Sequence, residues 1–111
     1  MKICNKYSNF FCLGIFLTVF PSQIMALESN WKNPQEAYSK VCAYCHNTGV
    51  GPNTIKIKFE GEGIKYRTDS IFNTVRSGLN AMPAFRQTEI DNKTLRELAE
   101  GLAKGSIKWK Q

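Results

Sequence analysis

The first helical pattern in the chain lies over positions 34–43. Its apolar residues recur at the three- and four-residue spacing of one helix face, and they are Ala37, Tyr38, Val41 and Cys42. Asn33 can cap this helix through its side-chain oxygen, and Pro34 suits the first helical position because an N–H there would lack a helical partner. The pattern predicts a helix that ends at about Ala43.

A second, shorter helix is predicted over 70–77. Thr68 or Asp69 can cap its start, and Gly78 is placed to end it. The side chains expected to face inward are Ile71, Val75 and Phe72.

The last helix is predicted over 92–104, with Asp91 as its cap and Gly105 at its end. Its buried stripe consists of Leu95, Leu98, Ala99 and Leu102. The basic tail at 106–111 follows, and Trp109 is the residue there that could pack back on the domain.

Residues 54–67 have a period of two instead. The apolar members of this pattern are Ile55, Ile57, Phe59, Ile64 and Tyr66, and lysine or arginine alternates with them. A Glu-Gly-Glu-Gly stretch at 60–63 separates the two runs, which is typical of a β-hairpin. An irregular loop is the alternative, because two isolated strands are only marginally stable in water.

An apolar run at 10–20 precedes all of these elements. Lys2 and Lys6 lie before it, and Ala26 offers a small residue for cleavage, so residues 1–26 are expected to be a signal peptide. An uncleaved membrane anchor is the alternative, although a span needs about 20 apolar residues. The expected product is exported to the periplasm, with one domain at 27–111 and no stable membrane span.

Removal of this segment changes the composition of the 111-residue chain in a useful way. The net charge falls from +6 to +4, because Lys2 and Lys6 are lost and no acidic residue is. The only cysteine, histidine and methionine side chains that remain are Cys42, Cys45, His46 and Met82. A domain this small often needs a metal or cofactor to complete its core.

The motif Cys-Ala-Tyr-Cys-His at 42–46 is the attachment signature of a c-type haem. Two thiols one helical turn apart can each bond one vinyl group, and His46 then reaches the iron. We therefore expect one haem c per chain, with thioether bonds from Cys42 and Cys45.

Three other readings of the motif are less consistent with the sequence. Structural zinc normally takes four protein ligands, and no second cluster exists outside residues 42–46 after cleavage. A thioredoxin-type disulfide is expected at a helix start in a βαβ context, whereas this motif ends a helix. A chance match without a cofactor is the third.

Met82 is the candidate for the second axial ligand. It is the only methionine of the expected mature chain, and Pro83 stiffens the backbone beside it. A lone methionine is often a core gap-filler. A soft sulfur ligand opposite histidine raises the reduction potential, however, as suits a carrier.

The combination of 42–46 with Gly51-Pro52, the stretch 78–85 and a C-terminal helix resembles a small class I bacterial cytochrome c. Residues 71–85 are similar to those of the cytochrome subunits of p-cresol methylhydroxylase-type flavocytochromes. The resemblance implies an all-α fold, with three or four helices around a haem and a possible β-hairpin insertion at 54–67. The N- and C-terminal helices would cross, bringing Tyr38 to Leu95 or Leu98.

The resemblance also implies roles for individual residues. His46 and Met82 would be the axial ligands, and the carbonyl of Pro52 would accept from the imidazole, although Pro52 can also be an ordinary turn proline. Phe85 would pack on the haem. The arginines that could pair with a haem propionate are Arg67, Arg76 and Arg86.

The basic residues of the hairpin raise the question of a partner. Lys56, Lys58, Lys65 and Arg67 would share one face of a hairpin. This face could be simply solvated, could contact a propionate, or could steer an acidic redox partner, such as a flavoprotein dehydrogenase subunit. Nucleic acid is a poor reading, because the charge is modest and no binding motif is present.

The expected function is electron transfer by a carrier with no catalytic residue. A haem peroxidase or gas sensor with a displaceable Met82 is the main alternative. A thiol-disulfide oxidoreductase that uses Cys42 and Cys45 is a second, more remote one.

Overall fold

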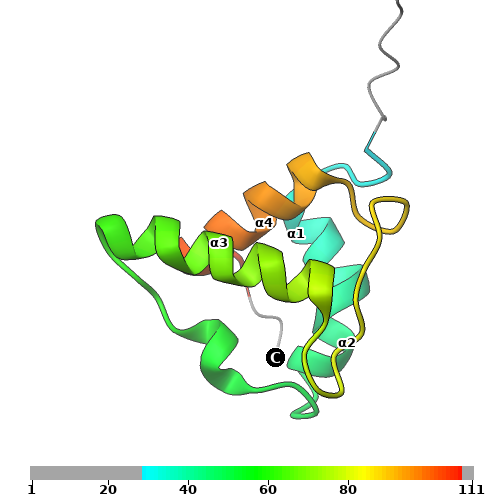
Figure 1. Cartoon of the computed structure of the whole chain (residues 1–111), viewed down its shortest axis with the longest axis horizontal. Helices are drawn as coiled ribbons and strands as arrows, with labels where there is room; N and C mark the ends of the chain where they lie inside the picture. Colours follow the sequence, from blue (N-terminus) through cyan, green and yellow to red (C-terminus); the bar gives the residue numbers. More distant parts are fainter. Residues whose placement is uncertain (1–28, 109–111) are drawn as a thin grey trace, which may run out of the picture.

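The computed structural model describes residues 29–108, and their backbone is mainly helical (Figure 1). Three consecutive segments form one helical rod: α1 (Pro34–Ala37), the π-helical turn η1 (Tyr38–Cys42) and α2 (Ala43–His46). A 3₁₀ turn η2 (Asn53–Lys56) leads to α3 (Glu62–Ser77), and α4 (Asn92–Lys104) follows. The expected all-α fold is confirmed, and no strand is present among the described residues.

The rod begins as the sequence predicts. Asn33 Oδ1 accepts a hydrogen bond from the Glu36 backbone N–H at 2.8 Å, and Pro34 occupies the first helical position. The rod continues three residues past the predicted end, to His46. The chain passes through η1, where the Ala43 N–H donates to the carbonyl of Tyr38 five residues earlier, and then continues as α2.

Helix α4 has the predicted bounds. Asp91 Oδ1 accepts from the Thr94 backbone N–H at 2.8 Å, and Gly105 ends the helix in the left-handed region at a φ of 74°. Its predicted stripe is buried, and Leu95 and Ala99 are fully so. Ile107 folds back over Gly101, whereas Trp109 lies outside the described residues.

The predicted β-hairpin at 54–67 is wrong. Residues 53–56 form η2, and α3 begins at Glu62, so Thr68 and Asp69 lie inside α3 and do not cap it. The helix buries Thr68, Ile71 and Val75, with half-buried Ile64 one turn before them. This spacing of four and three residues outweighs the short alternation at 64–67.

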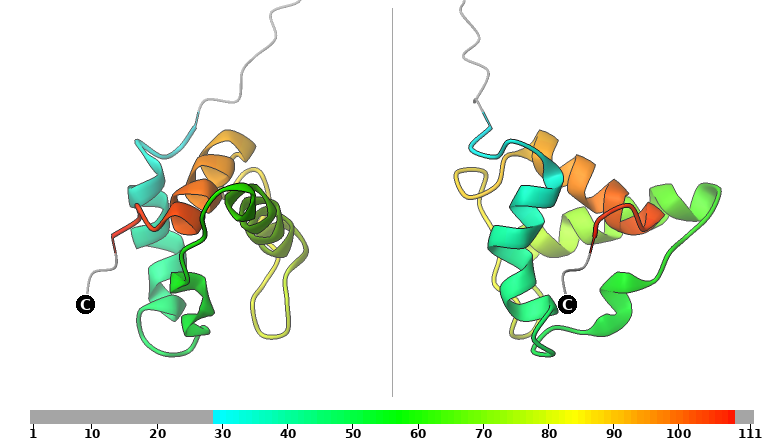
Figure 2. Two further views of the ribbon diagram at one scale, coloured as in Figure 1. Left: turned by 90° about the vertical axis from the view of Figure 1, so that its left-hand side faces the viewer. Right: turned by 180° about the vertical axis from the view of Figure 1, so that it is seen from behind.

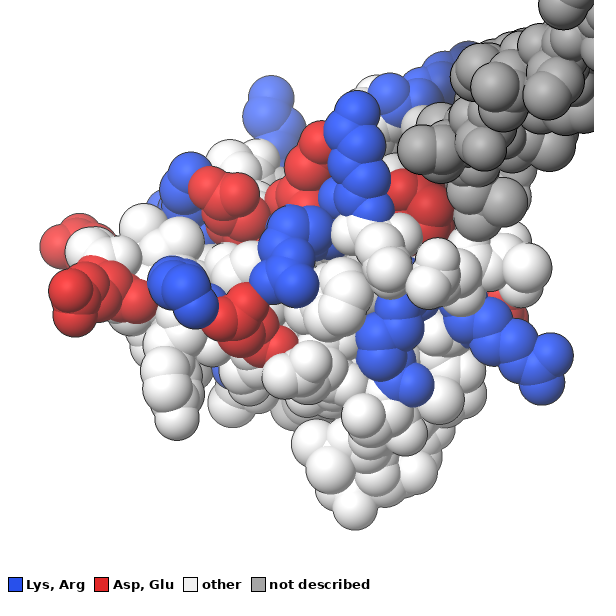
Figure 3. Space-filling view, turned by 45° about the horizontal axis from the view of Figure 1, so that its top comes forward, with Lys and Arg blue, Asp and Glu red and all other residues white. Residues whose placement is uncertain are grey.

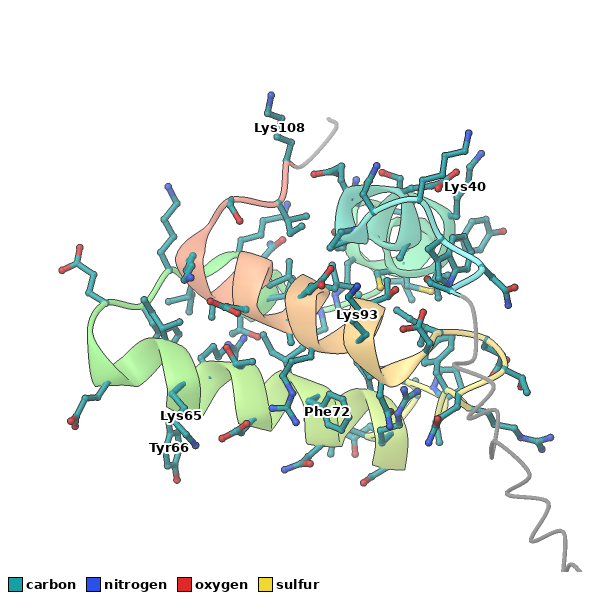
Figure 4. The ribbon with its side chains drawn as sticks, turned by 90° about the horizontal axis from the view of Figure 1, so that it is seen from above. Lys40, Lys65, Tyr66, Phe72, Lys93 and Lys108 are labelled. Carbon is teal, nitrogen blue, oxygen red and sulfur yellow. The ribbon has the colours of Figure 1, made fainter. Side chains whose placement is uncertain are left out.

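The exposure of Tyr66 gives the physical reason for this correction. A strand would have placed Tyr66 on the same apolar face as Ile64, yet its side chain is 83% exposed and points away from the bundle (Figure 4). The preceding segment remains extended, and the Phe59 N–H donates to the Ala103 carbonyl at 2.8 Å. The backbone of Phe59 is thus bonded to the end of α4 and not to 64–67.

The helices enclose a single core. Helix α4 packs against both α3 and α1, and the three cross in the views from the side and from behind (Figure 2). Tyr38 on the rod and Leu95 and Leu98 on α4 belong to the same buried cluster, as the crossing of the terminal helices requires. The described helices include none that is long and apolar enough to cross a membrane. The expected signal peptide at 1–26 lies outside the described residues.

Candidate functional site

The end of the helical rod carries the three residues of the sequence motif. Cys42 is half-buried and packs against the core, Cys45 is exposed, and His46 is buried with 8% of its surface accessible. Both thiols are free, with no disulfide between them. The rod therefore presents two thiols and an imidazole within two helical turns.

The electrostatics of these groups disfavour charge. Burial, and then the neighbouring Cys45, raise the pKa of the Cys42 thiol to about 12. Burial lowers the pKa of His46, and the backbone carbonyl of Pro52 opposes this effect by raising it. Both side chains are thus neutral near pH 7, and Cys42 lacks the stabilised thiolate typical of thiol-disulfide oxidoreductases.

Nδ1 of His46 has an unusual environment. It is buried and has no hydrogen-bond partner, although the Pro52 carbonyl is near enough to raise the pKa of the imidazole. Gly51 lies against the same face, and a Cβ atom built on it would come within 2.5 Å of Nδ1. The Gly51 N–H also donates to the Cys45 carbonyl at 2.9 Å, which fixes the backbone beside the imidazole. The turn after the rod therefore fits closely around the His46 ring.

Met82 lies in a tight turn after α3. Leu79 and Met82 exchange backbone hydrogen bonds of 3.0 and 2.9 Å, with two residues between them. The first of those two is Asn80, whose φ of 54° is in the left-handed region that asparagine tolerates. The Met82 side chain is partly buried and packs against the core. This turn and α2 lie at the same end of the molecule (Figures 1 and 2).

Gly78 begins the turn and packs against the backbone of Met82 and Ala84, where the turn ends. Its φ is 75°, and a Cβ atom there would lie 2.9 Å from the Met82 carbonyl oxygen and 3.0 Å from the Ala84 nitrogen. On the exit side, the Phe85 N–H donates to the Val75 carbonyl at 2.8 Å. The backbone around Met82 is therefore held at both ends by the last turns of α3.

The two packing residues expected from the resemblance have different surroundings. Phe85 is half-buried and packs against the core, close in sequence to Met82. Pro52 is exposed, and its carbonyl raises the pKa of His46.

The three candidate arginines are separated by their contacts. Arg76 donates to Phe85, Ile90 and Asn92, and the Arg86 side chain is exposed. Arg67 donates to the Thr54 carbonyl at 3.0 Å and lies over the Phe59 ring, while its buried Nε has no hydrogen-bond partner. Sequence reasoning could not rank the three, because the segments they contact are distant in sequence.

Several residues important for the geometry were missed by sequence reasoning. The sequence indicates Gly78 only as the end of a helix and Gly51 only as part of the Gly51-Pro52 match, whereas each is also required by the close approach of a neighbouring group. The Tyr38 hydroxyl donates to Asn47 Oδ1 at 2.8 Å and so ties the start of the π turn to the end of the rod. No motif signals this pair, because it depends on the register of η1.

This end of the molecule carries few charges. No acidic or basic residue occurs in 41–55 or in 77–85 apart from His46, whose pKa is lowered. The large apolar side chains exposed in these segments are Tyr44, Val50 and Leu79. In Figure 3 the lower lobe is correspondingly without charged side chains. Within residues 29–108, the structure holds no group of three His, Cys, Asp or Glu side chains placed to bind a metal ion.

Comparison with known proteins agrees with this arrangement. Residues 29–100 match the family described as cytochrome c oxidase, cbb3-type, subunit III. The chain belongs to this family, and it is a class I c-type cytochrome. It therefore carries a covalently bound c-type haem and is an electron-transfer haem protein.

The cytochrome also has a curated relative. It is 36% identical over 76 residues to the 4-cresol dehydrogenase (hydroxylating) cytochrome c subunit of Pseudomonas putida. The match covers 68% of this chain and 63% of that protein. No solved structure matches the chain.

The described residues of the cytochrome fit a haem group. Cys42, Cys45 and the buried His46 lie within two turns of one helix, so two thioether bonds and one imidazole ligand can reach a single group from this end of the rod. Sulfur and imidazole are both ligands that suit haem iron.

Proposed function

We propose that this cytochrome is an exported one-electron carrier with His46 and Met82 as the axial ligands of its haem iron. The observation that carries the proposal is the tight Leu79–Met82 turn, which holds a partly buried thioether at the same end of the molecule as buried His46. A turn closed by two backbone hydrogen bonds lowers the entropic cost of keeping a sulfur atom at a metal.

Cys42 and Cys45 would hold the haem covalently. Each thiol adds across one vinyl group, so that sulfur bonds one vinyl carbon and the thiol hydrogen goes to the other.

The remaining residues orient and shield the group. The Pro52 carbonyl, which raises the pKa of His46, would accept a hydrogen bond from Nδ1–H, and this leaves the other ring nitrogen for the iron. Phe85, three residues after Met82 and likewise packed against the core, would contribute apolar surface to the haem. Bound haem supplies the Fe(III)/Fe(II) couple, and the thioether of Met82 favours the reduced state because it is a soft ligand.

The location and partner follow from the same reasoning. Residues 1–26 would direct export to the periplasm and would then be removed, leaving the domain at 27–111. The relative is the cytochrome subunit of a dehydrogenase, and this supports electron delivery from a flavoprotein dehydrogenase. The uncharged end with Tyr44 and Leu79 is where such a partner would approach the haem.

The first test measures covalent attachment in the native protein. The haem should remain with the polypeptide in acidic acetone, and titration should find no free thiol at Cys42 or Cys45. Extractable haem with two free thiols would instead favour thiol-disulfide chemistry.

The second test replaces the methionine, as Met82→Ala. The wild-type ferric protein should show the methionine-to-iron absorption band, and its ferrous form should not bind carbon monoxide at neutral pH. The variant should lose the band, bind carbon monoxide and have a lower reduction potential, because water or no ligand replaces the soft sulfur. Carbon monoxide binding by the wild-type protein would favour a peroxidase or gas sensor over a carrier.

A further inference from the structure

The side chain of Arg76 joins three segments that meet at the exit of the Met82 turn. We propose that Arg76 is a positioning residue, which keeps Met82 on the haem iron by fixing the segment that follows it. The proposal rests on the axial role of Met82 proposed above, and its test separates the two.

The contacts of Arg76 form a clamp between α3 and the segment 85–92. One terminal nitrogen, Nη1, donates to the Phe85 carbonyl at 3.0 Å, and Nη2 donates to the Ile90 carbonyl at 2.8 Å. Asn92 Oδ1 accepts from Nη2 at 2.7 Å and from Nε at 3.2 Å. The guanidinium thus bridges the turn exit, the residue before the α4 cap and the first residue of α4.

Phe85 is the point at which the clamp acts on the Met82 turn. Its N–H is bonded to the Val75 carbonyl and its C=O to Arg76, so both polar groups of one peptide segment are held by adjacent residues of α3. At the entry of the turn, the Gly78 N–H donates to the Thr74 carbonyl at 2.8 Å. Without Arg76 the entry would remain fixed, but the exit would lose the hydrogen bond to the Phe85 carbonyl and keep the bond from the Phe85 N–H.

The chemistry of the guanidinium suits this role and not that of a haem-propionate partner. Arginine has five N–H donors in a planar fork, and the four hydrogen bonds of Arg76 use four of them. The group also lies 5.4 Å from the centre of the Phe72 ring, which restricts its orientation. A lysine has a single charged nitrogen and cannot span the same three acceptors.

Arg96 provides a matched control on the same aromatic ring. Its guanidinium lies 4.3 Å from the centre of Phe72, and it pairs with Asp69 at 2.6 Å. Among the residues that the structure describes, its side-chain hydrogen bond goes to Asp69 on α3 and not to the segment 78–92. Arg96→Gln therefore removes an arginine from Phe72 without touching the Met82 turn.

The experiment compares the haem-loaded wild type with Arg76→Gln, Arg76→Lys and Arg96→Gln. Cyanide binding to the ferric form measures how readily Met82 leaves the iron. We expect Arg76→Gln to bind cyanide about tenfold more tightly. In the wild type the hydrogen bonds of the charged Arg76 stabilise the state in which Met82 is on the iron, so the substitution destabilises that state and not the cyanide-bound one. Arg76→Lys should fall between Arg76→Gln and the wild type, and Arg96→Gln should match the wild type.

Two further readouts distinguish positioning from general destabilisation. The methionine-to-iron band of Arg76→Gln should weaken while its helical circular dichroism and haem content stay at the wild-type level. Unchanged cyanide affinity in Arg76→Gln and Arg76→Lys would overturn the role of Arg76. An equal rise in cyanide affinity in Arg96→Gln would show a nonspecific effect and would also overturn it. If the wild type itself lacks the methionine band, the axial assignment of Met82 fails instead.

Discussion

Gly51 has its role because of one close approach. A methyl group at this position would lie 2.5 Å from His46 Nδ1 and 2.8 Å from Cε1, distances that real Cβ contacts do not reach. The imidazole of His46 is buried, and the Gly51 N–H is bonded to the Cys45 carbonyl. Both the ring and the glycine backbone are therefore held in place. The glycine therefore sets the position of the ring that follows the second thiol.

Gly51→Ala should consequently displace the His46 ring. We expect a loss of about 1–3 kcal/mol in the free energy of unfolding, typical of overpacking, and a lower yield of haem-loaded protein. Denaturant unfolding and the haem absorbance per polypeptide measure the two effects.

The control for this variant is Gly49→Ala. Gly49 has a φ of 84° but open space around it, so alanine there adds backbone strain without touching His46. A normal haem yield in Gly51→Ala would contradict the steric explanation. An equal loss of haem yield in Gly49→Ala would contradict it too.

Among elements, α4 depends on the cap at Asp91. Burial alone would raise the pKa of this carboxyl, but the Thr94 N–H and the hydroxyls of Ser29 and Thr94 outweigh it and lower the pKa to about 2. The ionised carboxylate thus stabilises the folded state. This contribution is fully present above the ordinary value of 3.8 and is lost as the pH falls through about 2.

Asp91→Asn tests the charge separately from the cap, since asparagine is also a good N-cap residue. Near neutral pH the variant should be less stable than the wild type by about 1 kcal/mol. The difference should shrink as the pH falls from about 4 to 2, measured by urea unfolding at each pH. A pH-independent difference would assign the loss to packing and not to the charge.

The segment 53–67 is the element for which the sequence pattern was misleading. Alternation over four residues fits a strand, but Ile64, Thr68, Ile71 and Val75 continue one helical face over three turns. The longer pattern wins because α3 buries this face against α4. The basic face expected of a hairpin is lost with it, and Arg67 instead contacts Thr54 and Phe59.

At the scale of the whole molecule, charge and site are separated. Lys65 on α3 forms an ion pair with Asp69, and Lys40, Lys65 and Lys108 project in different directions (Figure 4). The segments 41–55 and 77–85 contain no Lys, Arg, Asp or Glu. The proposed approach surface around the exposed side chains of Tyr44, Val50 and Leu79 is therefore uncharged, and we do not expect steering through a basic patch there.

The electron self-exchange rate between ferrous and ferric copies checks this surface. We expect the rate, measured by NMR line broadening, to rise only modestly between low and physiological salt, because the net charge of +4 makes two copies repel at long range although no charged side chains meet at the contact. Val50→Lys places a charge on the exposed surface and should make the salt dependence clearly steeper. A steep dependence in the wild type would indicate contact through a charged face.

The sequence by itself determined the helices that end in strong local signals and the chemical groups of the site. Asn33, Asp91 and Gly105 act through neighbours in the chain, so their roles are local and readable. The motif at 42–46 likewise requires only its spacing, and the family comparison confirmed the haem that it predicts.

Only the tertiary structure decided how these groups are held. The π turn that extends the rod, the fit of Gly51 against His46 and the bonds from Arg76 to Phe85 and Ile90 join residues whose proximity no local pattern encodes. The course of 53–67 was decided the same way, since burial of one face of α3 against α4 outweighed a short alternating pattern.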